Sequence, residues 1–145
     1  MTFHDLPQDW PTRSLADPAL AADIVDLVVT DQDRAEGGLA FLLCRADGSL
    51  AQPMFIETDG CPAPAELVRH VADVVEHVPE VRGLVVAVAK PFAGVTDADR
   101  RVHQEAIEVC RSQGLVLHGT FLATRSGVRV LPVAAELVDG TSGAA

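Results

Sequence analysis

The apolar run GLVVAVA, residues 83–89, constrains the fold of this chain more than any other segment. The run is short, contains no polar side chain and is rich in β-branched valine, which is typical of a strand buried on both faces of a sheet. A strand of this kind needs cover above and below its sheet. The sequence therefore predicts an α/β domain with helices packed on a sheet in three layers.

Capping and turn residues place the other elements around this strand. Asp17 is a suitable N-cap with Pro18 after it, and Asp47-Gly48 joins two apolar runs as a hairpin turn. Thr96 and Asp99 have the spacing of a capping box, with Gly114 as the helix C-cap. The predicted order is helix, hairpin, helix, strand, helix, hairpin, the last hairpin turning at Ser126-Gly127. This order predicts a mixed sheet.

Apolar periodicity predicts which helix faces are buried. The first helix is expected to bury Leu20, Ile24, Leu27 and Val28. The helix that begins near Pro64 is expected to bury a longer stripe at helical spacing, namely Leu67, Val68, Val71, Val74, Val75 and Val78. Pro53 lies in the second run of the first hairpin, which predicts an edge strand or a bulge there.

The length of 145 residues predicts one domain. We expect an irregular N-terminal arm over residues 1–15, a single α/β domain over 16–138 and a disordered tail over 139–145. The first residues lack the features of a signal peptide, and no apolar run has the length of a membrane span. The expected location is the cytoplasm, and no membrane partner is expected.

The net charge of −10 disfavours binding to nucleic acid or to an anionic membrane and would suit a basic partner. Lys90 is the only lysine among eleven basic residues, an arginine bias that a GC-rich, bacterial-type genome would give. The three cysteines contain no C-x-x-C pair, so neither a disulfide framework nor a cysteine zinc site is expected. Cys44 and Cys110 are expected in the core. Cys61, in a loop, is the one candidate for a reactive thiol, although a structural role is favoured.

No motif predicts a cofactor. The phosphate-binding patterns G-x-x-x-x-G-K-[ST] and G-x-G-x-x-G are absent, and Asp97 beside Asp99 would repel an anion from the helix start. His70 and His77 lie two turns apart on one helix, about 10 Å, which is too far to share one ion. Lys90 could be a desolvated nucleophile, but a lysine that extends to solvent at a strand end is favoured.

Two segments carry a resemblance to a known family. EGGLAFLLCRADGSL and VVAVAKPFAGVTDAD resemble the glutamate-led first hairpin and the strand with metal loop of the RadC-type branch of the JAB/MPN metallopeptidase-like superfamily. The resemblance covers roughly residues 20–132. It implies a JAB/MPN-like fold with cytidine-deaminase-like layering. It also implies that Glu36 stands at the position of the catalytic acid/base.

The family's metal loop reads H-N-H-P-S-G-D-P-T-P-S-x-x-D, and this chain matches it only in part. Pro91 follows the second histidine position, Thr96 stands at the serine position and Asp99 at the aspartate ligand position. Val88 and Lys90, however, occupy the two histidine positions. One carboxylate beside a valine and a cation cannot hold zinc, which needs three protein ligands. The resemblance therefore implies a degenerate member without a metal centre.

Two functional hypotheses follow. The first is a non-catalytic JAB/RadC-like domain that acts by protein–protein or ligand binding, with dimerisation through an edge strand or through the helix of residues 67–78 as one possibility. The alternative is a metal-assisted or acid/base hydrolase whose shifted site consists of Glu36, Asp99 and His103. For Thr96 and Asp99 a helix cap is a sufficient explanation, and for His103, one turn after Asp99, a helix-surface pair is favoured. The Asp-His pair that RadC-type sequences carry in the next strand falls on Gly119 and Thr120.

Overall fold

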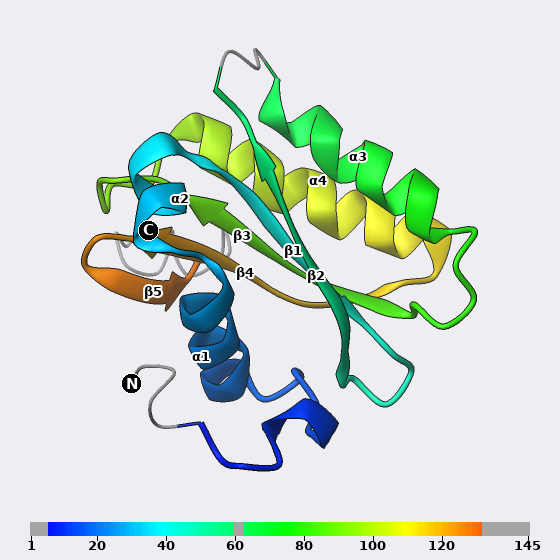
Figure 1. Ribbon diagram of the computed structural model, residues 1–145. Helices are drawn as coiled ribbons and strands as arrows, with labels where there is room; N and C mark the ends of the chain where they lie inside the picture. The colour runs from blue at the N-terminus through cyan, green and yellow to red at the C-terminus, as the bar shows by residue number, and fades with distance from the viewer. Residues whose placement is uncertain (1–5, 60–62, 132–145) are drawn as a thin grey trace, which may run out of the picture.

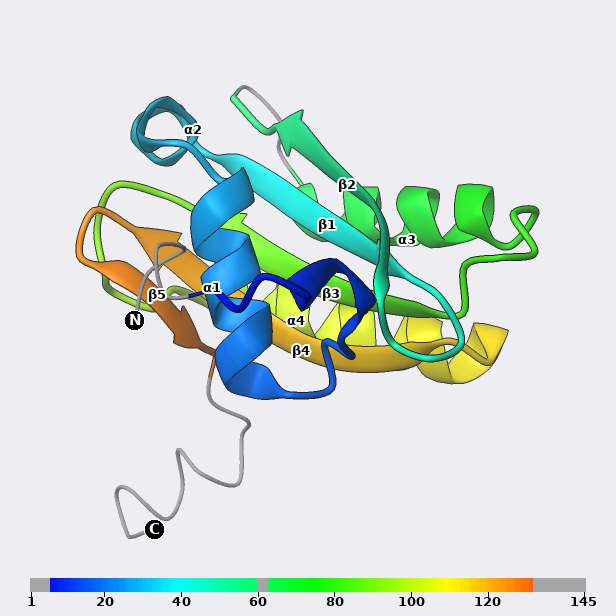
Figure 2. The same cartoon turned by 60° about the horizontal axis from the view of Figure 1, so that its bottom comes forward.

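The computed structural model describes residues 6–59 and 63–131, which form a five-stranded sheet with helices on both faces. Helices α3 and α4 cover one face, and α1 covers the other (Figures 1 and 2). His4, Cys61 and the predicted tail of residues 139–145 lie outside the described residues. The elements are a 3-10 helix Trp10–Thr12, α1 Pro18–Val28, α2 Asp31–Glu36, β1 Gly38–Cys44, β2 Leu50–Glu57, α3 Pro64–Val75, β3 Gly83–Ala89, α4 Asp97–Gln113, β4 Val116–Thr124 and β5 Gly127–Val130.

The sheet is mixed, as the sequence predicts. Its strand order is β2-β1-β3-β4-β5, with β3 parallel to β4 and every other neighbouring pair antiparallel. The turn at Asp47-Gly48 joins β1 to β2, and Gly48 has a φ of 87°, which favours glycine. Strand β2 lies at an edge and contains Pro53, so the edge prediction is confirmed.

Strand β3 is the central strand and is buried along its whole length. Its alternate side chains serve two separate cores. Leu84, Val86 and Val88 pack under α3 and α4, whereas Val85 and Ala87 pack with α1 and the N-terminal arm. The fully apolar sequence of residues 83–89 is explained by this position, because a polar side chain on either face would lose its water.

Two helix faces differ from the periodicity prediction. In α1, Asp17 caps the helix as predicted, its side chain accepting a hydrogen bond from the amide of Ala19. Leu27, however, is 37% exposed, while Val25 is fully buried. The buried stripe is thus rotated, because α1 packs on β4 and β5 at one side of the sheet. In α3, Val68, Val71 and Val75 are buried as predicted and Leu67 is partly buried, whereas Val74 is 64% exposed. Val78, also partly buried, lies beyond the end of the helix.

Helix α2 is absent from the sequence prediction. It is only six residues long and begins with a capping box in which Thr30 and Asp33 bond each other's backbone amides. The buried Arg34 side chain fixes this helix, since it donates to the carbonyl oxygens of Thr124 and Val29 and forms an ion pair of 2.8 Å with Asp26. These long-range contacts stabilise a helix too short to be stable alone.

The N-terminal arm predicted over residues 1–15 packs on the domain where it is described. Its described part contains the 3-10 turn Trp10–Thr12, and Leu15 is fully buried in the core on the α1 side. Within the described residues, no helix combines the length and the apolar character that crossing a bilayer requires.

Candidate functional site at the end of β3

The candidate site is a cavity at the point where β3 ends and the chain turns into α4. Its volume is about 290 Å³. Val88, Lys90 and Asp99 line it, and its other walls are mostly apolar or backbone, among them Gly37, Pro64 and Val102. The structure therefore brings together three of the positions that the family resemblance singles out.

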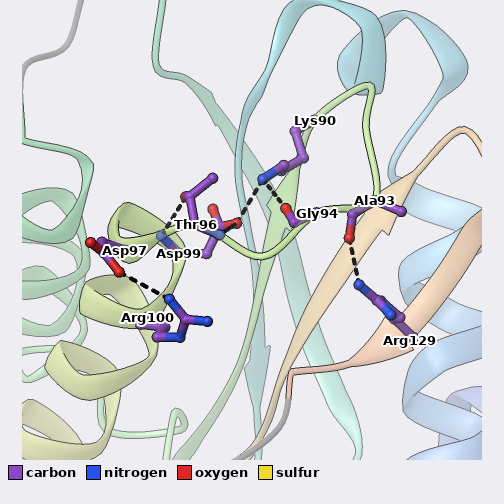
Figure 3. Close-up of polar contacts among 8 residues, drawn as sticks. All are labelled: Lys90, Ala93, Gly94, Thr96, Asp97, Asp99, Arg100 and Arg129. Atoms are coloured by element: carbon purple, nitrogen blue, oxygen red, sulfur yellow. Dashed lines mark hydrogen bonds and ion pairs between the residues drawn. The ribbon is translucent and has the colours of Figure 1, made fainter.

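Lys90 and Asp99 form an ion pair inside this site. The Nζ atom of Lys90 lies 2.7 Å from Oδ2 of Asp99, and the two side chains are 19% and 7% exposed. The same ammonium donates to the carbonyl oxygen of Gly94 at 2.5 Å (Figure 3). The lysine therefore does not extend freely to solvent, because its charge is held between a carboxylate and a backbone carbonyl.

Asp99 also caps α4, as the sequence predicts. Its Oδ2 accepts the amide of Thr96 at 3.0 Å, while its own amide donates to Oγ1 of Thr96 at 3.2 Å. One carboxylate oxygen thus serves both the helix cap and the ion pair. Chemically, this is a carboxylate paired with an internal cation, and a metal ion bound to it would be repelled by the ammonium of Lys90.

Glu36 lies beside the cavity and does not line it. It is the last residue of α2, and its carboxylate accepts a hydrogen bond from Nε2 of Gln32 at 3.0 Å. It lines a second cavity of about 510 Å³ together with Glu57 and Asp59. Gly37 is common to both cavities, so the Glu36 backbone adjoins the candidate site while its side chain belongs to the neighbouring one.

His103 lies outside the lining of the cavity as well. Its Nδ1 is 2.8 Å from Oγ1 of Thr120 on β4, and burial lowers the pKa of the imidazole. Its Nε2 is buried and has no hydrogen-bond partner among the described residues. The structure therefore places Glu36, Asp99 and His103 in three separate sets of contacts rather than around one common space.

No other chemistry is concentrated in the described part of the chain. Within residues 6–59 and 63–131, no group of three or more histidine, cysteine or acidic side chains could hold a metal ion. His70 and His77 are exposed on and just after α3. Cys44 and Cys110 are buried core residues as predicted, and burial raises their thiol pKa values to about 12 and about 11, which disfavours the thiolate form that reacts.

The sequence does not predict the hydrogen bonds that fix the β3–α4 loop, residues 90–96. The amide of Lys90 donates to the carbonyl of Ala123 at 3.0 Å, and the guanidinium of Arg129 donates to the carbonyl of Ala93 (Figure 3). Phe92 lies between these anchors and is 72% exposed. A phenylalanine in a Pro/Gly loop is visible in the sequence, but no local signal reveals the contact with Arg129, which is 36 residues away.

These contacts give the site a fixed loop, a closed ion pair and an exposed aromatic side chain.

Comparison of the chain with models of protein families finds no match, and comparison with curated proteins finds no match either.

Proposed function

We propose that this chain is a non-catalytic, JAB/RadC-like α/β domain that acts by binding another protein. The single observation that carries the non-catalytic half of the proposal is the ion pair between Lys90 and Asp99. A hydrolytic metal centre needs three protein ligands and an open position, so that the metal lowers the pKa of a bound water. At this site an ammonium group lies 2.7 Å from the one carboxylate that the resemblance retains as a ligand.

The element order supports the same proposal. A helix, a hairpin, a helix, β3, α4 and a final hairpin, with helices on both faces of the sheet, agree with JAB/MPN-like, cytidine-deaminase-like layering. In this arrangement Val88 and Lys90 occupy the end of β3 and Asp99 the first turn of α4. The proposal includes a cytoplasmic location, which the sequence analysis predicts.

Zinc titration of untagged protein tests the non-catalytic half of the proposal. We expect no stoichiometric zinc in the purified wild type and no binding at micromolar zinc. The variant Val88→His with Lys90→His removes the competing cation and supplies two imidazoles, so we expect it to bind one zinc ion. Adding Asp99→Asn to that variant should abolish the binding, and circular dichroism should confirm that each variant is folded.

Stoichiometric zinc in the wild type, lost in Asp99→Ala, would refute the non-catalytic reading. A folded double variant that binds no zinc would contradict the family placement. For the binding half, the wild type should capture a partner from cells of the source organism that a variant with scrambled surface charges does not. Equal recovery by both would remove the support for partner binding.

A further inference from the structure

The end of the sheet at which β3 finishes has an apolar centre. Strand β3 is the third of five strands, so the loop of residues 90–96 lies midway between the two edges. Phe92 is the most exposed of the large apolar side chains described, at 72%. Because Ala93 and Gly94 have their carbonyls held by Arg129 and Lys90, the loop can present this ring with little loss of backbone entropy on binding.

On the β1–β2 side of this centre the surface is acidic. Glu36, Glu57 and Asp59 are exposed and line the cavity of about 510 Å³. None of the three takes part in the five ion pairs found among the described residues. We call these three residues the acidic half.

On the β4–β5 side two arginine side chains are exposed. Arg125 lies in the turn between the two strands, Arg129 lies on β5, and both are exposed. Neither forms an ion pair with a described residue. We call these two residues the basic half.

We propose that this end of the sheet is the interface of a two-fold symmetric dimer, so that the partner of this chain is a second copy of itself. A two-fold interface joins the same patch of both copies, and each side contacts its opposite number. Rotation about an axis near Phe92 places the basic half of each copy on the acidic half of the other. The result is an apolar centre with a charged rim on both sides. This inference rests on the proposed binding function and names its partner.

Opposite charges on this surface favour its use in a contact between copies. The chain carries a net charge of −10, so two copies repel one another unless opposite charges are brought together. Five strands at a spacing of about 4.8 Å span roughly 19 Å, and the flanking helices widen the face further. That is the scale of an interface of about 800 Å² per partner.

The sheet edges are poorer candidates for the same role. Pro53 removes a backbone donor in the middle of the β2 edge, and β5 is only four residues long. Pairing of either edge with a second sheet would form few hydrogen bonds. Dimerisation through the end of the sheet needs no strand pairing.

Sedimentation velocity over a concentration series tests the dimer. We expect the wild type to dimerise, with a dissociation constant that rises with salt. Arg125→Glu and Glu57→Arg should each raise the constant about 100-fold, because each puts two like-charged contacts in the interface. An equimolar mixture of the two variants should form a heterodimer. In this heterodimer the unchanged Glu57 of one copy faces the unchanged Arg125 of the other. At the second contact the two substituted side chains face each other, so a favourable pair is restored with its charges exchanged.

Matched controls change the same charges at the opposite end of the sheet. Arg111→Glu in the last turn of α4 and Glu80→Arg before β3 should leave the dimer unchanged, whereas Phe92→Ala should weaken it. A monomeric wild type would overturn the inference. A dimer whose dissociation constant does not change in Arg125→Glu would also overturn it. The same holds if the mixture of Arg125→Glu and Glu57→Arg forms no heterodimer. None of these results affects the zinc titration, so failure of the dimer is distinct from failure of the proposed function.

Discussion

Oδ2 of Asp99 lies 2.7 Å from the ammonium of Lys90, and the same oxygen accepts the amide of Thr96. A single atom therefore ties the end of β3 to the start of α4. Any change that removes the charge of either partner affects the strand end, the loop and the helix cap together.

Removing the Lys90 ammonium should destabilise the protein, because it leaves the Asp99 carboxylate buried without its counter-charge. We expect Lys90→Met to lower the free energy of unfolding by about 3 kcal/mol, measured by urea denaturation. Asp99→Asn in the same background should cost much less than it does in the wild type. Additive effects of the two substitutions would contradict an energetic coupling between the side chains.

The stability of the protein should increase as the pH rises toward and through about 6.5, the usual pKa of histidine. Burial lowers the pKa values of His103 and His118 below their usual value of about 6.5. The unfolded chain therefore binds more protons than the folded one in this range, and stability is lost as the pH falls.

Urea denaturation at a series of pH values measures this dependence. The variant His103→Gln with His118→Gln should flatten the curve, and exchange of the exposed His70 and His77 for glutamine serves as the matched control. If the dependence of stability on pH is unchanged in the variant lacking His103 and His118, other titratable groups control it.

Two glycines of the site should respond in opposite ways to alanine. A Cβ at Gly38 would lie 2.3 Å from the Phe55 ring and 2.6 Å from the carbonyl oxygen of Ile56, so Gly38→Ala should cost about 1–3 kcal/mol. A Cβ at Gly94 meets nothing within 4 Å. Gly94→Ala should be neutral or stabilise by up to about 1 kcal/mol. Thermal denaturation of both variants checks the contrast, which equal losses would contradict.

The thiols of Cys44 and Cys110 should be unreactive in the folded protein. Burial raises the pKa of both groups, so neither forms a thiolate near pH 8. We expect Cys61→Ser protein to react with a thiol-specific disulfide reagent only after unfolding, when two thiols become accessible. Rapid reaction under native conditions would show that one of the two is exposed by local opening.

Local signals in the sequence predict most of the fold. The caps at Asp17 and Thr96, the turn at Asp47-Gly48 and the apolar run of β3 each act within a few residues, and all are confirmed. Local sequence patterns do not predict helix α2 or the buried stripe of α1, because tertiary contacts determine both. Arg34 reaches Thr124, 90 residues away, and no window of sequence contains both.

In the candidate site, too, local sequence predicts some features and tertiary contacts determine the others. The T-x-x-D spacing predicts the cap that Thr96 and Asp99 form, but not that Lys90 completes it. That contact joins two residues nine positions apart and requires the loop between them to fold back. The side-chain direction of His103 likewise follows from the packing of α4 on β4, which helical periodicity alone does not determine.

Lys90 is the only lysine in the sequence, and its amine is held between Asp99 and Gly94. Enzymes that acetylate lysine or attach a protein tag to it need a free, uncharged ε-amine. While the β3–α4 loop stays closed, the described fold offers them none. Modification of this amine would therefore require the ion pair with Asp99 to break and the β3–α4 loop to open first.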